Sequence, residues 1–329
     1  MVFPTKRSLL AGSVLLLLAE FQVLTATDYV GGWLPGSPKK QCVDICVNAK
    51  AAPTCPTSDP ACLAKKQRTG DFDYLMLEQI YVPQFCRDLL KGTDTTVSHQ
   101  NVNPYPNGVT CKPEVVESEL TIHGLWPNYN NGYAGCCNVS DAVGNHPFNA
   151  ATFANNHAHL LNEMSAKWVD PTQSNPRDTL CEIYNHEFQK HGLCYASSGS
   201  SYGAAAATYF RATLNVARTV QEATKQIDRW AGSAKAQAPS LRAVEALYSK
   251  RVQVFCSGVD DKRNRLSAVR TCYAKPARIG STGPFKQVDC APTATQGALV
   301  VCDATSPISL DGYTPPRNPA LQQQQQYRR

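Results

Sequence analysis

Neither sign of charge dominates the 329-residue sequence, and charged side chains are sparse. Lysine and arginine number 32 against 26 aspartates and glutamates, a formal net charge of +6, and charged residues make up 18% of the chain. Non-specific nucleic-acid binders carry denser basic clusters, so this balance permits a polyanionic partner without requiring one. With 43% hydrophobic residues, the chain can form a sizeable core, which excludes wholesale disorder. Its length allows one large domain or two ordinary ones.

After the N-terminus, no segment is apolar enough to span a bilayer. The one long apolar run covers residues 9–19; a basic pair precedes it at 6–7, and small residues follow at 25–26. This order is typical of a secretory signal peptide, and the run is shorter than the roughly 20 residues of a membrane span. We therefore predict a signal peptide over 1–26, secretion to the extracellular space or to a vacuolar or lysosomal lumen, and no membrane attachment after cleavage.

The cysteine-rich segment near the N-terminus lacks the features of a zinc site. Residues 27–69 are rich in proline, lysine and cysteine, yet they contain no Cys-x-x-Cys pair and no histidine, which are the usual zinc ligands. Fourteen cysteines in a secreted chain instead predict up to seven disulfides. We predict that 27–69 is an N-terminal extension stapled by disulfides. Its cysteines are Cys42, Cys46, Cys55 and Cys62.

No regular alternation of strand, helix and strand runs through the chain. Aromatic and branched residues bounded by turn residues predict strands, and apolar residues at helical spacing predict helices. We expect strands at 72–81, ended by Pro83, at 120–123, ended by Gly124 and Pro127, and at 252–256, 269–273 and 298–302, and helices at 153–168, 204–230 and 241–249. Strands and helices that occur together without a βαβ repeat favour an α+β fold. We place the folded domain at 70–305 and a disordered, glutamine-rich tail at 306–329.

The segment 186–194, His-Glu-Phe-Gln-Lys-His-Gly-Leu-Cys, lacks the H-E-x-x-H spacing of zinc proteases. On a helix with 100° per residue, His186 and His191 lie about 140° apart, which disfavours a shared metal ion. Glu187 and Lys190 fall within the same arc. Two imidazoles, a carboxylate and an ammonium group on one face predict a proton-transfer site, because histidine titrates near neutrality. The alternative is a solvated polar helix face.

A second motif, at 120–127, places His123 at the end of an apolar strand, followed by Gly124 and by the flat ring of Trp126. A histidine in such a place is more often a core residue when it stands alone, but the second histidine motif makes a shared site the better interpretation. The other histidines have no neighbouring pattern that suggests ligands, and we expect no site at them. They are His99, His146, His157 and His159.

With both motifs, the sequence resembles the ribonuclease T2 family of secreted endoribonucleases. The family signatures read approximately T-I-H-G-L-W-P and H-E-W-x-K-H-G-T-C, and both occur here in order, at 121–127 and 186–194. Residues 72–86 resemble the first strand of the family and 251–272 its later strands, so the resemblance covers about 70–305. It implies a central antiparallel β-sheet flanked by α-helices and rich in disulfides.

Three positions depart from the family pattern. Phe188 replaces the usual tryptophan and Leu193 the usual threonine; both lie outside the polar arc, so we expect modest effects on packing. Asn128 stands where many relatives carry aspartate; we expect it to take part in substrate binding, and the preferred base stays open. For substrate binding, we expect Trp126 to stack on a base, with Tyr129 or Tyr133, each stack contributing ~1–3 kcal/mol.

The resemblance also implies a mechanism that uses no metal ion and no cofactor, because RNA supplies its own nucleophile, the ribose 2′-hydroxyl. His191 is expected to be the general base and His123 the general acid in cleavage of single-stranded RNA through a 2′,3′-cyclic phosphate. Lys190 and His186 would hold the phosphate, and Glu187 would tune the centre. We expect a monomer. The rival interpretation is a secreted binding protein on the same fold, with a non-catalytic role.

The resemblance further implies part of the disulfide pattern. Cys194 is expected to pair with Cys136 or Cys137, Cys256 with Cys302, and Cys272 with Cys290. Independently of the resemblance, Asn138-Val-Ser140 is a glycosylation sequon, and we predict a glycan on Asn138.

Overall fold

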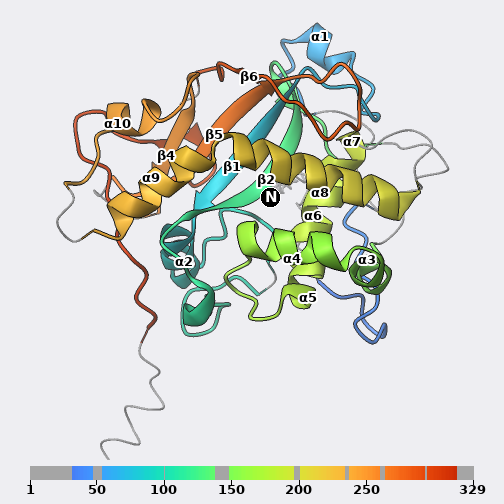
Figure 1. Ribbon diagram of the computed structural model, residues 1–329, viewed down its shortest axis with the longest axis horizontal. Helices are drawn as coiled ribbons and strands as arrows, with labels where there is room; N and C mark the ends of the chain where they lie inside the picture. The colour runs from blue at the N-terminus through green and yellow to red at the C-terminus, as the bar shows by residue number, and fades with distance from the viewer. Residues whose placement is uncertain are drawn as a thin grey trace, which may run out of the picture.

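In the computed structural model, the described residues are 32–46, 54–99, 101–137, 148–195, 201–233, 237–259, 264–292 and 295–316. They form one sheet whose strand order is β3-β2-β1-β5-β4-β8-β7, with β6 pairing with β5, and these strands pair antiparallel (Figure 1). The predicted α+β class with a central antiparallel sheet is confirmed. The strands are β1 Tyr74–Tyr81, β2 Leu120–Tyr129, β3 Gly132–Tyr133, β4 Gln253–Ser257, β5 Leu266–Ala274, β6 Gln287–Val288, β7 Thr295–Gln296 and β8 Leu299–Val301.

One face of the sheet packs against the long helices α8 (Tyr202–Thr219) and α9 (Gln221–Ala231), which cross it in Figure 1. Ser201 accepts a hydrogen bond from the amide of Ala204 and so caps α8. Leu75, Leu77 and Leu125 of the sheet share the main core with aromatic residues of the helical layer. The predicted helix 204–230 is therefore two helices, because Val220 leaves the helical backbone conformation (φ −116°, ψ 15°).

The predicted helix 153–168 is also divided, into α3 (Ala150–Asn156) and α4 (Ala158–Lys167). The break is His157, whose backbone (φ −132°, ψ 35°) is not helical. The remaining helical segments are short, and two of them are π-helical. They are α1 Pro60–Leu63, η1 Pro113–Val115, α5 Pro176–Thr179, the π-helix η2 Leu180–Tyr184, α6 Asn185–Glu187, the π-helix η3 Phe188–Gly192, α7 Leu193–Tyr195 and α10 Leu241–Glu245.

The opposite face of the sheet is only partly covered, by helix α2 (Val82–Leu90). Ile80, Phe85 and Phe255 form a second core there. Pro83 ends the strand as predicted, but it also occupies the first turn of α2, where its missing N–H leaves no hydrogen bond unmade. Because alternate residues of a strand share a face, Met76 and Glu78 lie on the same side as Ile80, beyond the end of α2.

Strand β2 is longer than predicted and continues through Pro127 to Tyr129. On the side of β2 that faces β3, only Asn128 and Tyr129 are paired. Pro127 therefore lies at a sheet edge on that side, where a residue without an N–H is tolerated. Residues 306–316 also differ from the prediction of a tail that starts at 306. Ile308 is fully buried in the main core, and the carbonyl of Leu310 accepts a hydrogen bond from Tyr81.

All fourteen cysteines form disulfides, seven in total. The pairs are Cys42–Cys181, Cys46–Cys136, Cys55–Cys62, Cys86–Cys111, Cys137–Cys194, Cys256–Cys302 and Cys272–Cys290. The last three agree with the pairs that the resemblance implies. Two disulfides join 27–69 to the rest of the fold, so that segment is stapled onto the domain and not only within itself.

Within the described residues, no helix is both long enough and apolar enough to cross a membrane. Three predictions lie outside those residues. They are the signal peptide at 1–26, the glycan on Asn138 and the end of the tail at 317–329.

Candidate active site

A cleft of about 450 Å³ opens on the sheet face that α2 leaves uncovered. All five predicted catalytic residues line it: His123, His186, Glu187, Lys190 and His191. They come from two segments that are far apart in the sequence, β2 and the helical run from α6 to η3. The predicted constellation therefore lies in one place, and except for Lys190 its members are at most 7% exposed.

A β-bulge in β2 sets the direction of His123. Glu78 of β1 is opposite Gly124 and Gln79 is opposite Ile122, so His123 is the extra residue without a partner on β1. The bulge shifts the alternation of side chains, and Ile122 and Leu125 both face the main core although they are three residues apart. His123, Trp126 and Asn128 consequently face the cleft.

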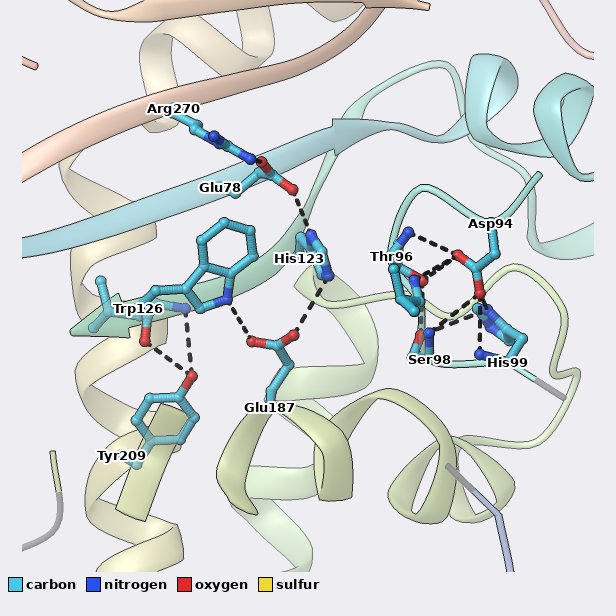
Figure 2. A network of polar contacts seen from close by, with 12 residues as sticks. Glu78, Asp94, Thr96, Ser98, His99, His123, Trp126, Glu187, Tyr209 and Arg270 are labelled. Atoms are coloured by element: carbon cyan, nitrogen blue, oxygen red, sulfur yellow. Dashed lines mark hydrogen bonds and ion pairs between the residues drawn. The ribbon is translucent and has the colours of Figure 1, made fainter. Parts of the chain in front are cut away.

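Gly124 brings β2 close to the second motif. A Cβ atom at this position would overlap the carboxylate of Glu187 and the indole nitrogen of Trp126. Glycine therefore allows Trp126 Nε1 to donate a hydrogen bond of 2.8 Å to Glu187 Oε2. The other oxygen, Oε1, lies 3.4 Å from His123 Nε2 (Figure 2). Glu187 thus connects the two motifs.

The helical run that carries His186 and His191 is not a regular α-helix. It passes into the π-helical turn η3, and in a π-turn a residue and the fifth after it come onto the same face. The imidazole centroids are 6.4 Å apart, so the predicted separation of about 140° is wrong.

The ligand atoms of His186, Glu187 and His191 lie within 4.8 Å of one another, so the distances alone would suit a metal ion. The charge of Lys190, which acts on both Glu187 and His191, disfavours a cation among them. Glu187 Oε2 is also engaged by Trp126. The absence of a metal requirement stays a prediction.

Glu78 and Arg270 are two buried charged residues of the site that the sequence patterns did not single out. Glu78 Oε1 lies 2.5 Å from His123 Nδ1, and Arg270 forms an ion pair with Glu78 Oε2 (Figure 2). Each sits inside an apolar strand, β1 or β5. A charged residue within an apolar strand is a signal that could have pointed to them, because such residues are rarely buried unless paired.

The two candidate acid–base histidines have opposite electrostatic surroundings. Burial lowers the pKa of His123, but Glu187 and Glu78 outweigh burial and the net direction is upward. Burial, Lys190 and His186 together hold the pKa of His191 well below 6.5. Of the two histidines, His123 therefore keeps its proton to the higher pH, and His191 is the one that is free to accept a proton.

Glu187 has an unusual carboxyl group. Burial raises its pKa to about 7, although His123, the Trp126 hydrogen bond and Lys190 act against the rise. A carboxyl with this pKa exchanges protons in the range where histidines do. It titrates together with His123, which lies 3.4 Å away.

The predicted base-binding residues differ in accessibility. Tyr129 is 1% exposed and packs in the main core, because the shifted alternation of β2 turns it away from solvent. Tyr133 is 40% exposed at the rim of the cleft and offers an open ring. Asn128 is 9% exposed and donates a hydrogen bond to the Trp126 carbonyl. Of the two tyrosines, Tyr133 is the one placed to stack on a base.

The half-buried ring of Trp126 contacts candidate catalytic groups as well as the cleft. His191 is 5.3 Å away between centroids, tilted by 30°, and the Arg270 guanidinium carbon is 5.3 Å from the centroid. Its N–H holds Glu187. These contacts give Trp126 a scaffolding role in addition to the predicted stacking role.

We expect Trp126→Ala to weaken RNA binding by the ~1–3 kcal/mol of one lost stack, which raises KM about 5- to 150-fold. Trp126→Phe keeps a ring but loses the N–H donor to Glu187, so it should lower kcat more than it raises KM. Steady-state kinetics of both variants, with circular dichroism to verify folding, separates the two roles. Unfolding of Trp126→Ala without a separable binding defect would contradict the stacking role and indicate a core residue.

A second buried polar cluster, formed by Asp94, His99 and Asp170, supports one wall of the cleft. His99 Nδ1 is 2.8 Å from Asp94 and Nε2 is 3.0 Å from Asp170. Asp94 also accepts hydrogen bonds from the amides of residues 96–99. This loop holds Val97 at φ +56°, a strained conformation for a β-branched residue. Because residues 94–97 line the cleft, His99, for which we expected no site, supports the site indirectly.

The geometry defines a candidate acid–base centre in a disulfide-rich α+β fold. The Ribonuclease T2 family model matches residues 72–279, more than half of the sequence, and the chain belongs to the ribonuclease T2 family.

Individual proteins are similar to parts of the chain. Ribonuclease 1 of Arabidopsis thaliana is 30% identical over 158 residues, 48% of this chain and 55% of that protein. Ribonuclease T2 of Homo sapiens is 40% identical over 76 residues, 23% of this chain and 24% of that protein. The crystal structure of human RNase T2 aligns with a TM-score of 0.46 and 20% identity, covering 75% of this chain and 100% of that chain. The chain spans about half the length of the first curated relatives it matches.

Proposed function

We propose that this protein is a metal-independent endoribonuclease that cleaves single-stranded RNA. The ribose 2′-oxygen attacks the adjacent phosphorus, the bond from phosphorus to the 5′-oxygen breaks, and the products are a 2′,3′-cyclic phosphate and a 5′-hydroxyl. The observation that carries the proposal is the pair His123 and His191, which line one cleft in opposite electrostatic environments. A reaction that removes one proton and delivers another needs such a pair.

His191 is the proposed base. Its imidazole is neutral near pH 7 and takes the proton of the 2′-hydroxyl. His123 is the proposed acid, and its Nε2 proton passes to the leaving 5′-oxygen. Each step of this kind typically contributes about 10²–10⁴-fold when the group lies within hydrogen-bonding reach.

The negative charge that develops on the phosphate needs preorganised positive charge. Lys190 and His186 line the cleft beside His191 and are the proposed phosphate-binding residues. Such electrostatic stabilisation is usually the largest single contribution in phosphoryl transfer. Glu187 links Trp126 to His123 and tunes the protonation of the centre. No protein nucleophile is needed because the attacking hydroxyl belongs to the substrate.

Secretion is part of the same proposal. Seven disulfides, with all fourteen cysteines paired, suit an oxidising compartment, and the N-terminal 26 residues have the pattern of a signal peptide. The relatives include both an extracellular and an intracellular ribonuclease of Solanum lycopersicum, and for this chain we propose an extracellular or a luminal location. We propose a monomer with a glycan on Asn138 and a catalytic domain that extends from about residue 70 to about 310, because Ile308 lies in the main core.

The proposal predicts the substrate and the products directly. Single-stranded RNA should be cut to fragments with 2′,3′-cyclic phosphate ends, and DNA of the same sequence should survive because it lacks the 2′-hydroxyl. EDTA should change the rate by less than about twofold, since acid–base and charge effects of the side chains supply the catalysis. Gel electrophoresis and mass spectrometry of the products test both points. Cleavage of deoxyoligonucleotides or full inhibition by EDTA would contradict the mechanism, and absence of any cleavage would favour the binding-protein alternative.

A further inference from the structure

Glu78 is a buried carboxylate in an otherwise apolar part of the sheet. Leu77 and Ile80 pack into the cores on the two faces of β1, and Glu78 is 1% exposed. Burying an ionised carboxylate is costly unless it is paired and hydrogen-bonded. Burial raises its pKa, but Arg270 and His123 lower it more, and the net direction is downward. Glu78 is therefore an ionised group held by its two partners.

The register of the sheet brings these partners together. Gln253 of β4 is opposite Arg270 of β5, Arg270 is opposite Glu78 of β1, and Glu78 is opposite Gly124 of β2, beside the bulged His123. Backbone hydrogen bonds fix this row, so the contact between Glu78 and His123 is built on rigid elements and does not depend on a loop.

Arg270 is itself held tightly. It is 4% exposed, and its guanidinium carbon is 4.8 Å from the Phe255 ring centroid and 5.3 Å from that of Trp126. A planar cation between aromatic rings has little freedom to turn. Arg270 consequently fixes the orientation of the Glu78 carboxylate as well as balancing its charge.

The contact with Glu78 decides which nitrogen of His123 faces the cleft. An ionised carboxylate can only accept hydrogen bonds, so Nδ1 of His123, 2.5 Å away, carries the hydrogen. Nε2 is then the nitrogen that gains and loses a proton. It points away from Glu78, toward Glu187 and the cleft (Figure 2).

We propose that Glu78 is a positioning residue for RNA cleavage: it fixes the ring of His123 with Nε2 directed at the leaving oxygen, and Arg270 fixes Glu78 in turn. This inference rests on the proposed function, in which His123 is the general acid. Glu78 touches no reacting atom and acts only through His123. The same carboxylate keeps the acid protonated at higher pH and so extends activity on the alkaline side.

Several charged or titratable groups surround His123 and bear on any pH dependence. They are Glu78 of β1, Arg270 of β5, Glu187 of α6, Lys190 and His191 of η3, and Asp94 of the loop after α2. Of these, Glu78 and Glu187 lie within 3.4 Å of the imidazole nitrogens. Glu78 is the one whose removal leaves the opposite, cleft-facing side of the ring unchanged.

The variant Glu78→Gln tests this role because it keeps an oxygen that can accept from Nδ1 and removes the charge. We expect kcat to fall at least about 10-fold above neutrality, and KM to change less than about threefold. The alkaline limb of the pH–kcat profile should move down by about 1 pH unit or more, the usual effect of one adjacent charge. Glu222→Gln removes an exposed carboxylate of α9 and is the matched control for net charge; its profile should equal that of the wild type.

Nitrogen-15 NMR of the histidine rings measures the same coupling without catalysis. In the RNA-free wild type, the His123 ring should keep its hydrogen on Nδ1 when it deprotonates, and in Glu78→Gln its pKa should be lower by about 1 unit or more. Glu78→Gln/Arg270→Gln removes both charges of the buried pair. It covers the case in which an unpaired Arg270 unfolds the single variant. It should also lower the pKa of His123, by less than the single variant does, because a cation is removed together with the anion.

The outcomes separate the two proposals. In a folded variant, an unchanged His123 titration together with an unchanged alkaline limb would overturn the positioning role while leaving ribonuclease activity established. If the wild type cleaves no RNA but the His123 titration shifts in Glu78→Gln, the proposed function fails and the coupling between Glu78 and His123 stands.

Discussion

Replacing His191 by alanine should lower kcat for RNA cleavage by at least about 100-fold, the lower end of the usual contribution of one acid–base group. The reason is that the variant removes the neutral imidazole that accepts the 2′-hydroxyl proton. His123→Ala should cause a loss of the same order by removing the proton donor to the leaving oxygen. Initial rates on a short oligoribonucleotide of defined sequence measure both effects.

The double variant distinguishes a shared mechanism from independent damage. Because acid and base act in one step, His123→Ala/His191→Ala should be little worse than either single variant, as is usual for groups that act as a unit. His159→Ala removes an exposed histidine of α4 and is the matched control; its rate should stay within about twofold. Retention of more than a tenth of wild-type kcat in a folded His191→Ala variant would show that another group is the base.

The pH–rate profile of the wild type follows from the same two histidines. Activity should rise as His191 loses its proton, at a pH below 6.5 because its pKa is lowered. It should fall as His123 loses its proton, at a pH above 6.5 because its pKa is raised. The curve is then a broad bell across neutrality, and its limbs belong to the coupled cluster that includes Glu187, not to single residues.

Asp170→Asn should destabilise the folded protein by about 3–5 kcal/mol, the usual cost of breaking a buried ion pair by removing one partner. Asp170 is 2% exposed and faces His99, which is 4% exposed and lies between two carboxylates. Urea or thermal unfolding with the disulfides intact gives the difference in the free energy of unfolding. Asp178→Asn disrupts a surface ion pair with Lys39 and should cost less than about 1 kcal/mol.

The loss of unfolding free energy in Asp170→Asn should depend on pH, and this dependence identifies the charged cluster of Asp94, His99 and Asp170 as its cause. Burial lowers the pKa of His99, but Asp170 and Asp94 raise it well above 6.5 overall. The contribution of His99 to the free energy of unfolding is therefore complete below about pH 6.5 and is lost as pH rises through the raised pKa. The pKa values of Asp94 and Asp170 are lowered, so their contribution is present above about pH 4 and is lost as pH falls through the lowered values. The difference between wild type and Asp170→Asn should therefore be largest near pH 5–6 and shrink at both extremes. A difference that does not vary with pH would indicate a packing defect.

Much of the architecture could be predicted because it depends on local patterns. Aromatic and branched runs located β1, β4, β5 and β8, and the lack of a βαβ repeat gave the α+β class. The two histidine motifs predicted the residues that line the cleft. Phe188 and Leu193, the departures from the family pattern, are both fully buried and contribute to packing, in line with the expectation that they act on the core.

Other features depend on the path of the backbone, which residue spacing does not reveal. The angular argument for His186 and His191 assumed a regular α-helix, and the π-turn η3 invalidates it. The pairing of Glu78 with Arg270 requires the register of two strands that are distant in sequence. The neighbours of His99 in the sequence suggest no site, and its partner Asp170 is 71 residues away in the chain. In each case the missing information is tertiary.

The bulge at His123 shifts by one residue the alternation of core-facing and cleft-facing side chains along β2. Upstream of it, Leu120 and Ile122 face the main core; downstream, Leu125 and Tyr129 do, and the intervening residues take the opposite side. If this sequence paired continuously with β1, without the bulge, inside and outside would be exchanged along the rest of the strand. The tryptophan and asparagine of the cleft would enter the core, and a leucine and a tyrosine would face solvent. In this strand, the most regular sheet and a working site are mutually exclusive.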